Sequence, residues 1–155
     1  MGLEDLYQEI ILDHYKSPRN RGAGLEPHDV HVHHSNPLCG DELDLWLRVA
    51  DSQVDAVAYD GDGCSISMAS ASAMTEAVTG RALADADDLA ETFRLMMHGD
   101  ELTREDDLLD GVAFQGVAKF PVRVKCALLG WMALRDAIAT HTAGQREHRV
   151  THEEA

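Results

Sequence analysis

Three cysteines are the residues of this sequence best suited to chemistry: Cys39 in LCGD, Cys64 in DGDGCS and Cys126 in VKCAL. Asp41 follows Cys39 by two positions, and in an extended segment residues i and i+2 point to the same side. Three thiolates and one carboxylate would suit zinc, which takes four ligands tetrahedrally. These ligands would come from distant parts of the chain, without a CxxC pair. On spacing alone, three separate buried cysteines that act as small hydrophobic residues are the favoured interpretation.

Each cysteine lies at the end of an expected element, where site residues gather on a rigid scaffold. Residues 3–16 carry apolar side chains at helical spacing, and Ser17-Pro18 should end that helix. Three short strands are expected next, in HDVHVHH (28–34), DELDLWLRVA (41–50) and VDAVAYDG (54–61). The clean alternation of the second strand indicates a sheet with one covered face, which is typical of antiparallel sheets.

After Gly63 the pattern becomes helical. Helices are expected in CSISMASASAMTEAVTG (64–80), ADADDLAETFRLMMHG (84–99) and VRVKCALLGWMALRDAIATH (122–141). Strands first and helices afterward predict an α+β fold, a small three-stranded antiparallel sheet with helices packed on one face. We expect residues 1–140 to form a single domain and the polar residues 141–155 to be a poorly ordered tail.

The composition excludes several classes of function. The formal net charge is −15, with 28 acidic against 13 basic residues, and such a surface repels nucleic acid. No signal peptide and no long apolar stretch is evident, so we expect a cytoplasmic protein that does not enter a membrane. A reducing compartment disfavours disulfides between the three cysteines.

A group of histidines, His28, His31, His33 and His34, could suggest a second metal site. Because they alternate with valines, we expect them instead to be polar residues on the solvent face of the first strand.

Three motifs in order, NPLCGD, GDGCSISMAS and KCALLGW, resemble those of the SufU/IscU/NifU-N family of iron–sulfur cluster assembly proteins. The opening YQEIILDHYKSPRN (7–20) is also typical of that family, so the resemblance covers nearly the whole chain. It implies a SufE/NifU-like fold. By motif position, it implies a metal site made by Cys39, Asp41, Cys64 and Cys126.

Two features point to one branch of the family. The scaffold branch carries a histidine directly before the third cysteine, where this chain has Lys125, and residues 98–123 resemble the insertion of SufU-type proteins. Those proteins bind zinc and accept sulfur from a pyridoxal-phosphate cysteine desulfurase of the SufS type. The resemblance therefore implies one zinc ion, Cys39 as the sulfur acceptor, and Arg123 as an accessory basic residue beside Lys125.

As a sulfurtransferase, the protein would use Cys39 to attack the partner's persulfide, after this thiolate has left the metal. It would then pass the sulfur on, for example to a downstream cluster scaffold. Two alternatives remain open. One is a scaffold that binds a transient [2Fe–2S] cluster through the same cysteines. The other is a non-catalytic interaction protein in which zinc only stabilises the fold.

Overall fold

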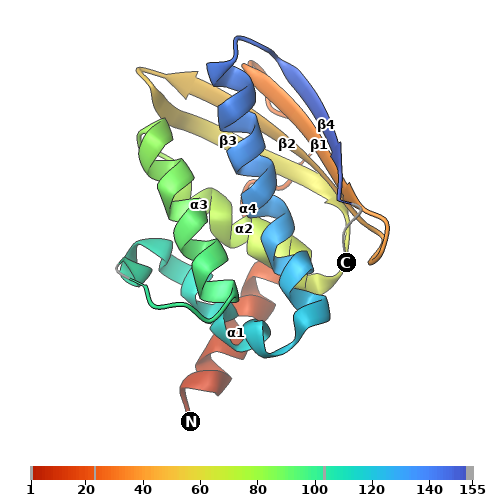
Figure 1. The fold of residues 1–155 in the computed structure, drawn as a ribbon, viewed down its shortest axis with the longest axis vertical. Coiled ribbons are helices and arrows are strands. Elements are labelled where there is room, and N and C mark those ends of the chain that lie inside the picture. The colour runs from red at the N-terminus through yellow and green to blue at the C-terminus, as the bar shows by residue number, and fades with distance from the viewer. Residues whose placement is uncertain (1, 23, 103, 153–155) are drawn as a thin grey trace.

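The computed structural model describes residues 2–22, 24–102 and 104–152. Its elements, in order, are α1 (Leu3–Lys16), β1 (Val30–Asn36), β2 (Asp41–Ala50), β3 (Gln53–Asp62), α2 (Ser65–Val78), α3 (Leu83–Met97), the 3₁₀ segment η1 (Glu105–Lys119), α4 (Pro121–Thr142) and β4 (Glu147–Thr151). Figure 1 shows the helices gathered on one face of the sheet, with α4 lying across the strands. Within the described residues, no helix is both long enough and apolar enough to cross a membrane.

The sheet has four strands in the order β3-β2-β1-β4. Strand β2 is antiparallel to both β1 and β3, whereas β4 runs parallel to β1. The prediction of a three-stranded antiparallel sheet is therefore wrong in strand number and direction. Residues 147–151, expected in the poorly ordered tail, form β4. This strand is exposed except at the half-buried Val150, so it carries no apolar alternation from which it could have been predicted.

The core lies between the sheet and the helices. Leu43, Leu45 and Leu47 of β2 are fully buried on the side of α4, and each contributes roughly 2 kcal/mol by leaving water. Trp131 of α4 stacks on Phe93 of α3, with ring centroids 4.6 Å apart. The expected strands and helices of residues 3–142 are confirmed, and the last helix begins at Pro121, whose fixed φ suits a first helical turn.

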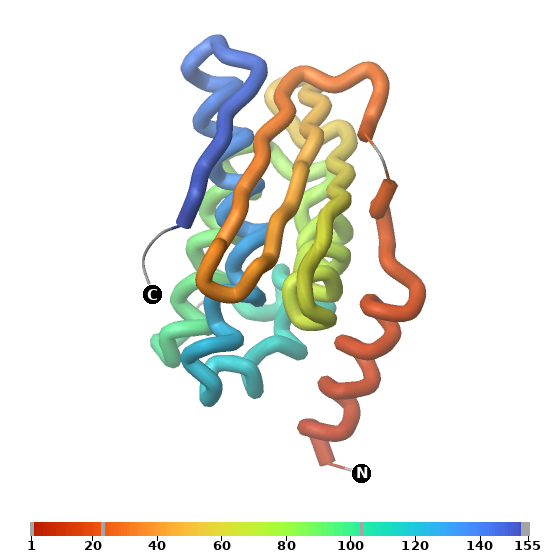
Figure 2. Tube along the Cα trace, turned by 90° about the vertical axis from the view of Figure 1, so that its right-hand side faces the viewer, coloured from red at the N-terminus to blue at the C-terminus, as the bar shows by residue number. Residues whose placement is uncertain are grey.

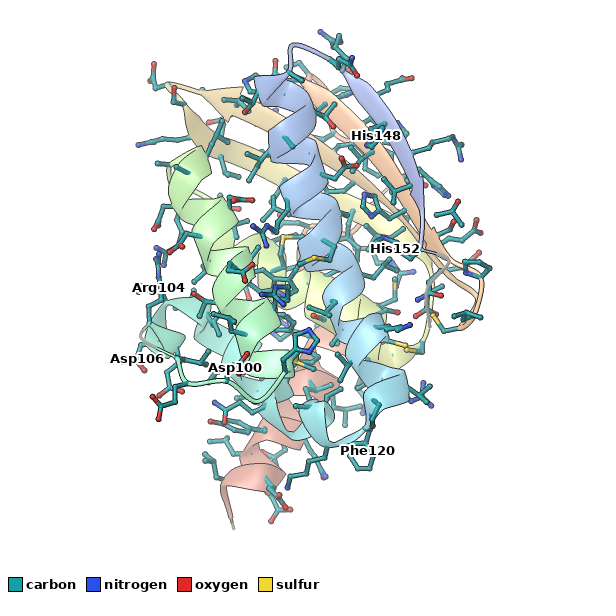
Figure 3. All side chains as sticks on the ribbon, viewed as in Figure 1. Asp100, Arg104, Asp106, Phe120, His148 and His152 are labelled. Atoms are coloured by element: carbon teal, nitrogen blue, oxygen red, sulfur yellow. The ribbon has the colours of Figure 1, made fainter. Side chains whose placement is uncertain are left out.

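The acidic segment before α4 forms η1, which contacts α1, α2, α3 and α4. Arg104, labelled in Figure 3, donates hydrogen bonds to Asp85 at 2.7 Å and to Asp88 at 2.9 Å, both on α3. These ion pairs attach the segment to the helical layer, from which it leads directly into the helix that carries Cys126.

Candidate metal centre

The structure brings the four predicted metal ligands together. Cys39 lies on the turn between β1 and β2, Asp41 begins β2, Cys64 precedes α2, and Cys126 lies in the second turn of α4. Ligand atoms of Cys39, Asp41 and Cys126 all lie within 4.8 Å of one another. The Cys64 Sγ atom is 3.8 Å from Asp41 Oδ2. All three thiols are free, so the arrangement is a cluster of four donors at the ends of three elements.

The turn that carries Cys39 is organised by Asn36. The Asn36 carbonyl accepts hydrogen bonds from the backbone N–H groups of Cys39 at 3.3 Å and Gly40 at 2.9 Å. The Asn36 side-chain oxygen accepts from the Leu38 N–H at 3.0 Å, and Gly40 adopts a left-handed φ of 75°. Sequence reasoning missed this role of Asn36, although an Asn-Pro pair is itself a turn signal.

Asp41 and Cys64 are joined through the start of α2. The Cys64 backbone N–H donates to Asp41 Oδ1 at 3.1 Å, which places the carboxylate at the positive end of the helix. A side chain on Gly63 would lie 2.4 Å from Ser67 Oγ, so only glycine allows this approach. Ser67 lies 3.7 Å from the Cys64 sulfur and is a second neighbour that sequence reasoning missed.

The hydrogen bonds from the sulfur atoms of Cys39 and Cys126 to the backbone are long. The Cys39 sulfur lies 3.6 Å from the Asn36 carbonyl, and the Cys126 sulfur lies 3.9 Å from the Val122 carbonyl. Burial raises the pKa of the Cys39 thiol. Burial, reinforced by Cys64 and Asp41, raises the pKa of the Cys126 thiol far above its usual range. A bound cation would allow these thiols to ionise beside the carboxylate, and this sulfur and oxygen donor set fits zinc.

The two accessory basic residues line different hollows. Arg123 is exposed on the first turn of α4 and lines a groove of about 790 Å³ between α1, η1 and α4. Lys125 is half-buried and lines a hollow of about 320 Å³ together with Asn36 and His152. Their roles toward Cys39 stay predictions.

The histidines of β1 divide between the two faces of the sheet. On the outer face, His31 and His33 contact Asp44 Oδ1 at 2.8 and 3.0 Å, on the side away from the helices. His34 is only 2% exposed and lies on the helix side, so the prediction of a solvent position is wrong for this residue. The reason is the period of two in a strand, which sends neighbouring histidines to opposite faces.

Helices on one face of a mixed sheet, with three thiols and a carboxylate at the ends of these elements, define an α+β protein with a thiol-rich candidate metal centre. The family model of the NifU-like N terminal domain matches residues 6–147. The chain therefore belongs to the NifU-like N-terminal family of iron–sulfur cluster assembly proteins, which includes SufU and IscU, and the predicted resemblance is confirmed.

Known relatives match over most of their length. The zinc-dependent sulfurtransferase SufU of Bacillus subtilis (strain 168) is 43% identical over 142 residues, which cover 92% of this chain and 95% of that protein. The iron-sulfur cluster assembly scaffold protein IscU of Streptococcus pyogenes serotype M1 is 39% identical over 138 residues, covering 88% and 84%. The crystal structure of a putative scaffold protein for the SUF system from Fervidobacterium islandicum AW-1 has a TM-score of 0.77 at 31% identity, covering 88% and 99%.

Proposed function

We propose that this protein is a zinc-dependent sulfurtransferase that accepts persulfide sulfur from a cysteine desulfurase on Cys39 and passes it on for iron–sulfur cluster assembly. One observation carries the proposal: the three thiols differ in their freedom to move. Cys126 is 1% exposed inside a helix, and Cys64 is tied by its backbone to Asp41. Cys39 is half-buried on a turn next to Gly40, so it is the thiol that can reach a partner.

Asp41, Cys64, Cys126 and Cys39 are the residues that would hold one zinc ion. Bound zinc supplies the positive charge that keeps these thiols deprotonated at neutral pH. The Asp41 carboxylate and the two firmly placed thiols would retain this charge in the site. Cys39 thereby becomes available as a thiolate despite the burial that raises its pKa.

The transfer step requires no oxidant or reductant. The Cys39 thiolate attacks the outer sulfur of the desulfurase persulfide, forming a new S–S bond. The S–S bond within the partner's persulfide breaks, and the partner's cysteine leaves as a thiolate. Cys39 then carries the persulfide, and the turn at Gly40 gives it the freedom to deliver the sulfur to a downstream cluster scaffold.

Exposed apolar side chains next to the site support a protein partner. Leu38, which precedes Cys39, is 61% exposed, and Val122, whose carbonyl lies beside the Cys126 sulfur, is 75% exposed. Phe120 is 61% exposed at the start of α4 (Figure 3). Apolar side chains gathered around a polar centre are typical of interaction surfaces. A pyridoxal-phosphate cysteine desulfurase of the SufS type is the partner that the motifs imply.

The alternative function is a scaffold for a [2Fe–2S] cluster, favoured by the relatives that are named as scaffold proteins. The same thiols would bind the cluster. Colour and metal content separate the two functions, since anaerobically purified protein with a cluster is brown. We expect colourless protein with one zinc per chain, measured by elemental analysis, and iron with acid-labile sulfide would favour the scaffold.

The proposed transfer is tested by mass spectrometry after incubation with desulfurase and cysteine. We expect one additional sulfur on Cys39 and stimulated desulfurase turnover. Cys39→Ala should remain folded but lose both, whereas the matched surface control Leu38→Ala should still carry the persulfide. A persulfide on Cys64 or Cys126, with none on Cys39, would refute the assignment. A Cys39→Ala variant that unfolds would favour a zinc ion with only a structural role.

A further inference from the structure

A chain of three histidines and one aspartate links β1, α4 and β4. His34 Nε2 lies 2.9 Å from Asp136 Oδ2, and His34 Nδ1 lies 2.8 Å from His152 Nε2. His148 Nδ1 lies 2.7 Å from Asp136 Oδ1. Figure 3 labels His148 and His152, both along the C-terminal strand beside α4. We call these four residues the imidazole array.

The positions of the protons in the imidazole array follow from its distances. A carboxylate only accepts hydrogen bonds, so His34 Nε2 and His148 Nδ1 must donate to Asp136. A neutral His34 then has a lone pair on Nδ1, and His152 Nε2 must donate to it. The bond between His34 and His152 therefore contains one proton, and two protons in that space would destroy it.

Among the residues that the structure describes, few side-chain contacts hold the end of the chain against the sheet. Strand β4 is exposed except at Val150, and beside its backbone pairing with β1 it accepts a hydrogen bond from Ser35 Oγ at Thr151 Oγ1, at 3.5 Å. The His152 N–H extends this pairing by donating to the Ser35 carbonyl at 2.8 Å. An edge strand with so little apolar burial belongs to the part of a fold that opens most easily. The imidazole array is thus a large share of what keeps it in place.

The same segment borders the turn that carries Cys39. Ser35 directly precedes Asn36, whose carbonyl accepts from the N–H groups of Cys39 and Gly40. His152 and Asn36 also line one hollow of about 320 Å³. Figure 2 shows β4 beside β1, running toward the turn between β1 and β2. Movement of β4 away from β1 would therefore remove support from this turn.

We propose that residues 147–152 form a C-terminal strap that holds the Cys39 turn in place and is released in acid, when both His34 and His152 bind a proton. One added proton is tolerated, because a charged His34 can donate to Asp136 and to a neutral His152. A second proton replaces the hydrogen bond with two facing positive charges. The family match ends at residue 147, so nearly all of the strap lies beyond it.

The surrounding charges favour release. His34 faces Asp136 from α4, His148 from β4 and His152 directly after β4, while His152 faces Asp136 and Lys125 from α4. When the histidines bind protons, His34 therefore has positive charges from both His148 and His152 beside it.

The direction of the pH effect follows from the buried position of the rings. Burial lowers the pKa of His34, and Asp136 offsets this only in part. Burial also lowers the pKa of His152, and Lys125 adds to that effect. Histidines with a lower pKa in the attached state than in the released state, about 6.5, stabilise attachment above that pH. This stabilisation of the attached state is lost as the pH falls below about 6.5.

Amide hydrogen exchange of the full chain tests the strap. We compare protection factors, corrected for the intrinsic pH dependence of exchange, between about pH 8 and about pH 5.5. Release that takes up one net proton changes its equilibrium tenfold per pH unit. We therefore expect protection of residues 148–152 to fall at least about tenfold over this range. The Gly40 amide should follow, while β2 and β3 stay protected.

Two variants decide whether the imidazole array is responsible. In His152→Gln, the side-chain amide can donate to His34 Nδ1 or accept from it, so the strap should stay protected in acid. In the control His31→Gln, on the outer face of the same strand, the strap should be released as in the original chain. Equal acid release in His152→Gln would overturn the proposal. Strap protection that does not change with pH, or that is lost together with β2 and β3, would also overturn it.

Discussion

Among the residues that the structure describes, two groups of side chains bring metal-type ligands within 4.8 Å of one another. One consists of Cys39, Asp41 and Cys126, which with Cys64 form what we call the thiol centre, and the other consists of His14, Glu76 and Asp110. His14 is fully buried between Ser72 Oγ at 2.7 Å and Asp110 Oδ2 at 2.8 Å. Arg19 lies 3.6 Å from Glu76, so this second group already contains a cation.

The difference between the groups lies in how well their donors are satisfied. In the His14 group, both ring nitrogens have short hydrogen-bond partners within the protein. In the thiol centre, the sulfur atoms of Cys39 and Cys126 have long hydrogen bonds to carbonyl oxygens, at 3.6 and 3.9 Å, and otherwise face one another, Cys64 and the Asp41 carboxylate. Proximity of ligands alone therefore does not indicate a metal site, because a group with complete internal hydrogen bonds gains little from an ion. The His14 group joins α1, α2 and η1, whereas the thiol centre has the donors that the proposed zinc ion would satisfy.

The largest effect is expected from Cys126→Ala. Loss of a residue that only orients a metal ligand costs about 10–100-fold in affinity, so loss of a buried ligand should cost more than about 100-fold. We expect the variant to retain little zinc by elemental analysis and to melt earlier by calorimetry. A variant that keeps one zinc per chain with unchanged affinity would remove Cys126 from the site.

His14→Ala should lower the stability of the fold without lowering the zinc content. It removes two buried hydrogen bonds and leaves Ser72 with a lost partner, so we expect unfolding in urea to become easier by about 2–4 kcal/mol. Zinc content should stay at one per chain. Loss of a metal ion on this substitution, with the thiol centre intact, would show that the two groups are alike.

Zinc affinity should rise with pH. Burial raises the pKa of the thiols of Cys39 and Cys126, so both are protonated in the metal-free protein at neutral pH. Each proton released on binding makes the affinity about tenfold higher per pH unit until that thiol ionises. Competition with a chelator between about pH 6 and about pH 8 measures the slope, with the chelator's own titration as the correction. A flat profile would mean that the thiols are not the ligands.

The smallest effect is expected from Asp44→Asn, on the outer face of the sheet. Burial acts to raise the pKa of Asp44, but hydrogen bonds from His31 and His33 outweigh it and lower that pKa. Asp44→Asn weakens these partly exposed contacts, which should cost less than about 1 kcal/mol in urea unfolding. Zinc content should not change. A drop in zinc per chain would support the histidine metal site that the sequence analysis disfavours.

The expected outcomes for the thiol centre concern residues that the sequence alone singled out. The cysteines and Asp41 are separated by up to 87 positions, yet their motifs, in order, predicted one centre before any geometry was known. The alternation of β2 likewise predicted which leucines are buried. Asn36 and Ser67 were missed because their side chains meet the site only when the turn before β2 and the start of α2 have folded.

By itself, the sequence determined the family and, apart from η1, the helices and strands of the first 142 residues, and it predicted the four donors that the structure brings together. These features depend on local periodicity and on motifs. Only the tertiary structure decided that residues 147–151 pair with β1 and that His34 is buried against Asp136. It also decided that both ring nitrogens of His14 have hydrogen-bond partners within the protein. An edge strand is held by backbone groups that every residue carries, and a buried polar network depends on which distant elements meet, so neither produces a pattern along the chain.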